Sequence, residues 1–350
     1  MNTKIFFTFS ILISLFFLIS CSSEDRFVVC KSSEYDCDYQ HSVPGIITIT
    51  KGSSRKHYIL TEKGLEKTGI TEGEPVSYNP ETGTALVKEV TDSSVDIFAV
   101  NAENGKIISP EIPLKPEKTL NEKGKNFYAF PKLLSACVQN DGTIVLLVNY
   151  ETPAMSVLDD DSAETVFLNV YEKGETKKLK KYRFMLTEEE KEEGPSENND
   201  EESNDYSWNE PKRIQCSGNE LYLFSEKHHF SGLSPFHVSQ PNWIMSRIDL
   251  GSKENETNIT DMAFIAHDDI TFNHYYRKKN IVGTILRSPE EGTEALRILK
   301  LENGYELPEE PVEKKDGGFL FSETPDGKPL IFFVKTRSRL EDQRIELLEL

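Results

Sequence analysis

The chain has 350 residues with 59 acidic and 40 basic side chains, and its formal net charge is −19. Proteins that bind nucleic acid need basic patches against the phosphates, so this charge argues against a nucleic-acid partner. With 37% hydrophobic residues, the chain can bury a core and form either one large repeat domain or two ordinary domains.

Residues 1–20 have the pattern of a secretory signal peptide. Lys4 and the amino terminus supply positive charge, and Ile5–Ile19 is a mostly apolar run. The run is shorter than the ~20 residues that a membrane-spanning helix needs, which favours a signal segment that is removed. We therefore expect the mature protein to begin after residue 20.

The signal segment ends in Leu18-Ile19-Ser20-Cys21, which resembles the bacterial lipobox. The resemblance implies that Cys21 is diacylated, becomes the new amino terminus and anchors the protein to a membrane. The alternative is an ordinary signal peptide with a cysteine near its end. Because Ser22 rather than an acidic residue follows the cysteine, the sequence favours the outer membrane of a bacterial cell envelope. Residues 21–25 would then form a short lipidated tether.

A repeating pattern follows, and its most complete copy runs from Glu74 to Leu114. Four short pieces rich in β-branched and aromatic residues alternate with breaks that carry Gly, Asn, Asp or Pro. The pattern predicts a four-stranded antiparallel meander with strands at 75–79, 84–90, 95–100 and 106–109. A single meander of this size leaves a face uncovered, so it needs copies beside it.

Similar units recur roughly every 40–55 residues, at 45–64, 132–184, 213–260, 270–304 and 318–350. The first unit lacks an opening strand and the last lacks a fourth. We predict an all-β fold, a β-propeller of six four-stranded blades over residues 26–350; seven blades or a pair of β-sandwiches are the alternatives. Phe27–Val29 is the apolar segment available to complete the last blade and close the ring.

One hairpin carries a resemblance to a known family. Phe319-Leu-Phe-Ser-Glu-Thr-Pro-Asp-Gly-Lys-Pro-Leu-Ile-Phe-Phe-Val resembles the WD-like propeller repeats of periplasmic proteins, such as the propeller of the Tol system. Ser77–Val87 and Leu133–Leu147 are looser copies of the same hairpin. The resemblance implies a ring that serves as a binding platform.

Four cysteines remain after Cys21, and an exported protein can form disulfides. Cys30 and Cys37 are close in sequence and are candidates for a bridge. Cys137 and Cys216 occupy matching positions in two repeats, each just before a turn that leads into an apolar strand. For this second pair we favour buried free thiols over a disulfide.

Much of the negative charge is local. Glu188–Asp205 contains ten acidic residues, one lysine and no apolar side chain. Such a stretch cannot bury enough apolar surface to offset its ordering entropy. We therefore predict a disordered insertion at residues 187–207, with a tether for calcium or a cationic peptide as the alternative.

Histidines and acidic residues occur in clusters but not in catalytic settings. His228-His229 with His237 is the densest cluster, yet adjacent residues on a strand point to opposite faces, which makes a poor metal site. Asp159-Asp-Asp161 lacks the spacing of a calcium loop. His267-Asp268-Asp269 and His274-Tyr275-Tyr276 have no recognisable nucleophile motif beside them. We expect no catalytic, metal or cofactor-binding residues.

Two functions remain open. The first is a lipid-anchored, non-catalytic propeller that binds another protein or an envelope component through loop insertions on one rim, Ser225–Asn242 and Leu158–Glu164. The second is a propeller that binds or processes glycans through its central channel. Two facing carboxylates in a channel pocket would favour the second function.

Overall fold

The computed structural model describes residues 24–348 except for 35, 92–93, 121–125, 152–164, 177–179, 185–205, 231–237, 251–256, 266–269, 288–292, 302–311 and 336–340. Cys21, predicted from the sequence to be acylated, the stretch Glu188–Asp205 and the cluster His267–Asp269 therefore lie outside the described residues. No helix in the described part of the chain is long and apolar enough to cross a membrane.

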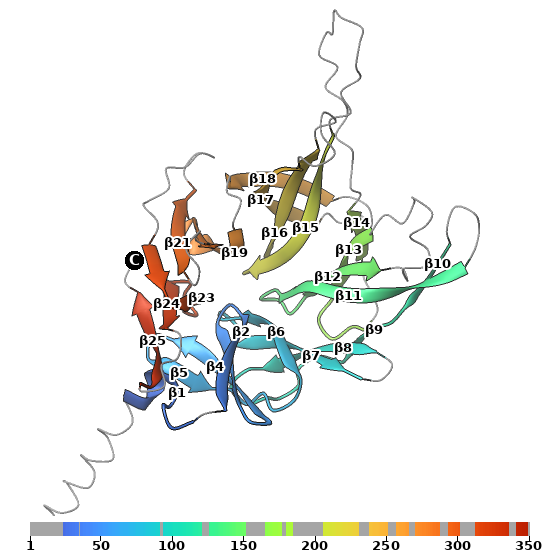
Figure 1. Cartoon of the computed structure of the whole chain (residues 1–350). Coiled ribbons are helices and arrows are strands. Elements are labelled where there is room, and N and C mark those ends of the chain that lie inside the picture. Colours follow the sequence, from blue (N-terminus) through green and yellow to red (C-terminus); the bar gives the residue numbers. More distant parts are fainter. Residues whose placement is uncertain are drawn as a thin grey trace, which may run out of the picture.

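The described residues form six antiparallel sheets arranged in a ring (Figure 1). The protein is therefore a six-bladed β-propeller, as the repeat period predicted. Its first three blades contain β2 (Cys37–Val43), β3 (Ile46–Lys51), β4 (Ser54–Thr61) and β5 (Gly64–Lys67); then β6 (Glu74–Asn79), β7 (Thr84–Val90), β8 (Val95–Asn101) and β9 (Ile112–Leu114); then β10 (Glu117–Leu120), β11 (Asn126–Val138), β12 (Ile144–Glu151), β13 (Thr165–Tyr171) and β14 (Lys180–Phe184).

The last three blades follow in the same order around the ring. They contain β15 (Tyr206–Ser217), β16 (Glu220–Phe230), β17 (Val238–Leu250) and β18 (Thr257–Ile265); then β19 (Ile270–Tyr276), β20 (Ile281–Arg287), β21 (Thr293–Lys300) and β22 (Val312–Lys315); then β23 (Gly317–Glu323), β24 (Pro329–Lys335), β25 (Gln343–Leu348) and β1 (Val28–Cys30). Among the described residues, the short 3₁₀ helices η1 (Glu24–Phe27) and η3 (Arg277–Lys279) precede β1 and β20.

The tight turns predicted from the sequence connect the inner two strands of their blades. Gly83 joins β6 to β7 with φ of +65°, and Gly327 joins β23 to β24 with φ of +77°. Glycine adopts such left-handed backbone angles without the steric cost that a Cβ atom brings. The two hairpins therefore form where the sequence places these glycines.

In the part of the chain that the structure describes, the core consists of six apolar clusters, and each lies between two neighbouring blades. In the largest one, Leu86 and Ile97 of the second blade pack with Ile144 and Leu146 of the third. Each sheet thus buries both faces, which explains the runs of consecutive apolar residues in strands such as β24. A single blade could not bury these faces alone, so stability depends on a closed ring.

The ring closes where the sequence predicted, between the two ends of the described chain. β1 pairs antiparallel with β25, with Val28 opposite Arg344. Val29 and Cys30 are buried in the cluster between the last and first blades, together with Phe332 and Ile345. One detail differs: Phe27 lies in η1 rather than in the strand, although it still packs against this cluster.

Several predicted strand positions were wrong. The first blade does have an opening strand, β2, which its polar sequence CDYQHSV concealed. In the second blade the fourth strand is β9, not residues 106–109. Within residues 106–109, Ile107 makes a single bridge to Val100. The ladder does not continue because the Ser109 hydroxyl accepts the Ala99 N–H. The third blade has a fifth strand, β10, which pairs with the protruding start of β11.

Two further segments also differ from the sequence expectation. The fourth strand of the fifth blade is β22, which lies beyond residue 304, the predicted end of that unit. The predicted loop insertion Ser225–Asn242 is largely a continuation of β16 and β17, which pair as far as Phe230 and Val238.

Both cysteine pairs are disulfides in the structure. Cys30, at the end of β1, is bonded to Cys37 at the start of β2, so this bridge links the last blade to the first. Cys137 on β11 is bonded to Cys216 on β15, with Cα atoms 5.5 Å apart. Our expectation of free thiols at Cys137 and Cys216 was therefore wrong. The matching strands of neighbouring blades approach within bonding distance beside the channel, which the sequence spacing could not show.

A candidate binding site in the central channel

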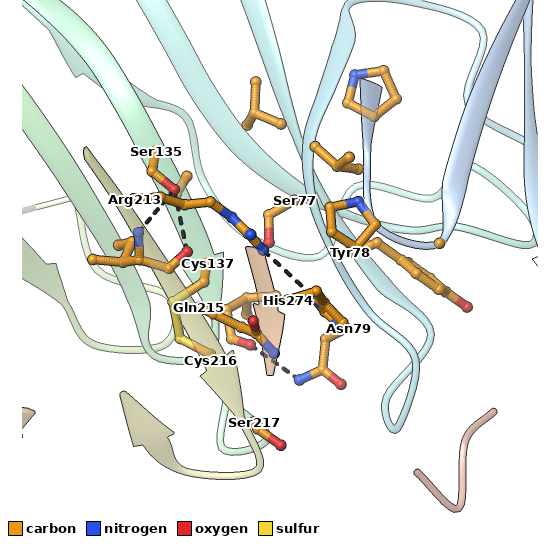
Figure 2. A pocket seen from close by; sticks show the side chains of 18 of the residues that line it. Ser77, Tyr78, Asn79, Ser135, Cys137, Arg213, Gln215, Cys216, Ser217 and His274 are labelled. Carbon is orange, nitrogen blue, oxygen red and sulfur yellow. Dashed lines mark hydrogen bonds between the residues drawn. A yellow bond between two sulfur atoms is a disulfide. The ribbon is translucent and has the colours of Figure 1, made fainter. Parts of the chain in front are cut away.

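The innermost strands of all six blades enclose a cavity of about 400 Å³. It is lined by the end of β2, by β6, by the second half of β11, by β15, and by side chains from β19 and β23. Its volume falls within the range of small-molecule binding sites. Figure 2 shows the side chains that project into it, with the Cys137–Cys216 disulfide in one wall.

Arg213 on β15 reaches across the channel wall toward the fifth blade (Figure 2). Its Nη1 donates to the carbonyl oxygen of Asn273, and its guanidinium carbon lies 4.2 Å from the centroid of the Phe272 ring. It also lies 5.5 Å from the centroid of the Phe224 ring. Burial lowers the pKa of Arg213 to about 9, still well above neutral pH, so the guanidinium remains charged.

His274 on β19 connects Arg213 to the sixth blade. Arg213 Nη2 lies 3.4 Å from His274 Nδ1, and His274 Nε2 lies 2.9 Å from Glu323 Oε1. An arginine can only donate, so Nδ1 accepts, and in a neutral imidazole Nε2 then carries the proton that it donates to Glu323. The ring is also held between aromatic side chains, 4.7 Å from the Tyr276 centroid and 5.9 Å from that of Phe321.

The other charged side chains that line the cavity are paired. Lys88 Nζ lies 2.9 Å from Glu74 Oε2, and Lys212 Nζ lies 2.6 Å from Glu210 Oε1 and 3.1 Å from Glu226 Oε2. Glu81, in the turn after β6, accepts a hydrogen bond of 2.6 Å from the side-chain amide of Asn140. These contacts fix the charged groups in the wall.

Side-chain amides and hydroxyls join the inner strands of neighbouring blades. Gln215 on β15 donates to the carbonyl oxygen of Tyr275 on β19 at 2.6 Å and accepts from the Tyr275 N–H at 3.1 Å. Ser135 on β11 makes the same kind of double contact with the backbone of Ile214, at 3.2 Å each way. The channel wall is therefore braced across blade boundaries and preorganised for a ligand.

The residues singled out from the sequence do not form one site. Of these, His274 lines the cavity, while Tyr275 and Tyr276 lie in the apolar clusters on either side of β19. His228 and His229 are in β16, opposite Trp208 and Ser207 of β15. His237 and Asp159–Asp161 lie outside the described residues, and no group of three metal-binding side chains occurs among the residues that the structure describes.

Sequence reasoning missed Arg213 and Glu323. The available signal was a charged residue inside a strand that opens a repeat, because the opening strand of each propeller blade faces the channel. Arg213 stands in such a strand, in Pro211-Lys-Arg-Ile-Gln-Cys216, and Glu323 ends another.

We expect acid to weaken the fold through two buried histidines. Burial lowers the pKa of His274 and also that of His57, whose Nδ1 lies 2.8 Å from the Thr48 hydroxyl. Below the unfolded value of about 6.5 the unfolded chain binds more protons than the folded one, so stability is lost as pH falls through the lowered pKa values. Between pH ~6.5 and its lowered pKa, each histidine reduces the free energy of unfolding by up to ~1.4 kcal/mol per pH unit.

Urea unfolding at pH 7.5 and 5.5 measures this effect. The free energy of unfolding should fall on acidification. Between the same two pH values, it should fall by less in the His57→Gln variant than in the parent protein. A His57→Gln variant with the full pH dependence would show that His57 is not held neutral in the folded state.

Comparisons with known proteins identify neither a family nor a function for this chain. No family model and no curated protein sequence matches the chain. Among solved structures, the Kuenenia stuttgartiensis hydrazine synthase is 12% identical, with a TM-score of 0.37 over 87% of this chain and 74% of that one. An oligogalacturonate lyase in complex with manganese is 10% identical, with a TM-score of 0.38 over 87% of this chain and 73% of that one.

A similar TM-score is found for a polysaccharide lyase, the PL25 ulvan lyase. It is 10% identical to this chain, with a TM-score of 0.38 over 89% of this chain and 78% of that one. Identities and scores this low support no inference about activity. The fold therefore defines the class of protein, a six-bladed β-propeller, and the function has to be argued from the site itself.

Proposed function

We propose that the protein is a lipid-anchored, non-catalytic β-propeller that binds a protein or another component of the bacterial cell envelope. The lipobox-like sequence at Leu18–Cys21 supports the anchor, and Ser22 after the cysteine favours an outer-membrane location. The anchor would hold the ring close to the membrane through a tether of a few residues. The ring offers two rims and a channel mouth as binding surfaces.

One observation carries the non-catalytic part of the proposal. The carboxylates that line the cavity in the described residues are Glu74, Glu81 and Glu323, and each is held by a partner in the wall. Glu74 and Glu81 also lie at opposite ends of β6. A glycosidase needs one carboxylic acid and one carboxylate facing each other across the scissile bond, which this arrangement does not favour.

The anchor is tested by Cys21→Ala. We expect the parent protein to partition into the detergent phase and the variant into the aqueous phase, because the variant cannot be acylated. A variant that still partitions with detergent would show that Cys21 is not the anchor.

The partner-binding surface is tested by photo-crosslinking in intact cells. Tyr128 lies near the start of β11, on the rim where β12 ends, and its side chain is 58% exposed. A photoreactive amino acid at Tyr128 should give a discrete adduct. The control places the same photoreactive amino acid at Glu103, an exposed residue in the turn after β8 on the other rim. Adducts from Glu103 but not from Tyr128 would assign binding to the opposite rim.

A further inference from the structure

Arg213 differs from the other cations that line the channel. Lys88 and Lys212 each form a salt bridge with glutamate. Among the described residues, the polar contacts of Arg213 are to a backbone carbonyl and to an imidazole, neither of which is negatively charged. The chain thus places a guanidinium without a bound carboxylate in a cavity of about 400 Å³. Such a charge is costly to bury unless something pairs with it.

The hydrogen-bond capacity of Arg213 is also incompletely used. A guanidinium has five N–H donors, and the contacts to Asn273 and His274 engage one each on Nη1 and Nη2. The side chain is half-buried and lines the cavity, so the remaining donors are within reach of a ligand. Ser77 of β6, whose hydroxyl also lines the cavity, adds a further polar group (Figure 2).

The position of the guanidinium is fixed before any ligand arrives. Phe272 stacks beneath it at 4.2 Å, and the Asn273 carbonyl holds one edge. Glu323 is the nearest acidic group in this hydrogen-bond network. It contacts His274 Nε2, on the side of the ring away from Arg213, and so pairs with the imidazole rather than with the guanidinium. A rigid planar fork of this kind suits the paired oxygens of a carboxylate or phosphate, which it can bind with two parallel hydrogen bonds.

We propose that the central channel binds a small anionic ligand through one carboxylate or phosphate group, with Arg213 as the anion-binding residue. This goes beyond the proposed binding function and does not depend on the lipid anchor, because the cavity lies within the ring. Loss of the Cys21 anchor and loss of anion binding can therefore be observed separately.

The test uses the purified mature protein and two anions, sodium glucuronate for a carboxylate and sodium phosphate. Glucose is the uncharged match for glucuronate, and sodium chloride at equal ionic strength is the salt control. Two quantities are measured: the melting temperature, and the rate at which phenylglyoxal modifies Arg213, followed by mass spectrometry of the peptide that contains it.

We expect at least one of the two anions to raise the melting temperature by several degrees and to slow modification of Arg213 several-fold, whereas glucose and chloride do neither. The anion that protects identifies the preferred group. In Arg213→Gln the thermal shift should disappear, and in Arg55→Gln, an exposed control on β4, it should persist.

Two results would overturn the proposal. One is modification of Arg213 at the same rate with either anion as with chloride. The other is an anion-dependent thermal shift that survives in Arg213→Gln. If Arg213→Gln does not fold, the rate at which phenylglyoxal modifies Arg213 in the parent protein decides by itself.

Discussion

Removing residues 22–30 from the mature protein is expected to open the ring. Val29 and Cys30 leave the cluster between the last and first blades, and Cys37 loses its disulfide partner. Burial of the valine is worth ~2 kcal/mol and the short disulfide loop ~2.5 kcal/mol. Together these correspond to a fall in melting temperature on the order of 10 °C. The exposed edge of β25 should also promote self-association.

The matched control removes residues 22–25 and keeps β1, with a soluble leader in both variants. Hydrogen exchange adds a direct readout: the amides of Val28 and Cys30 should be protected in the intact protein and should exchange freely once Gln343–Leu348 is deleted. Equal melting temperatures for the two truncations would contradict the closure of the ring through β1.

Replacing both Cys137 and Cys216 by alanine is expected to destabilise the protein more than replacing both Cys30 and Cys37. Each pair links neighbouring blades, but the two bridges span 79 and 7 residues of sequence. On the chain-entropy account the longer loop is worth about 4.5 kcal/mol and the shorter one about 2.5 kcal/mol. Alanine is a suitable replacement because all four cysteines lie in or beside apolar clusters.

Urea unfolding of the two double variants provides the comparison, and alkylation of the native protein without reductant provides the control. All four cysteines should resist alkylation until the protein is reduced. Ready labelling of Cys137 and Cys216 in the unreduced native protein would contradict the bridge. A smaller loss of unfolding free energy in the Cys137/Cys216 double variant than in the Cys30/Cys37 double variant would contradict the loop-length argument.

Hairpins with a strong local pattern were predictable from the sequence. β6–β7 and β23–β24 combine apolar strands with a turn that ends in glycine, and the structure has both within a residue or two of the predicted bounds. β2 was missed because only Cys37, Tyr39 and Val43 are apolar in its sequence CDYQHSV. Strands that face the channel can carry polar residues, so periodicity alone underestimates them.

The candidate site was harder to predict than the strands. His274 could be singled out from the sequence, but its partners Arg213 and Glu323 lie 61 and 49 residues away. They stand on the inner strands of the blades before and after it. Nothing in the local pattern of any of the three indicates that their side chains meet.

The amino-acid sequence by itself determined the period of the repeat, most of the strands and the segment that closes the ring. These features depend on alternation and turn residues, which act over a few neighbouring positions. Only the tertiary structure decided that Cys137 bonds to Cys216, and that Arg213, His274 and Glu323 line one cavity. Those contacts cross blade boundaries, and their distances are set by how the sheets pack around the closed ring.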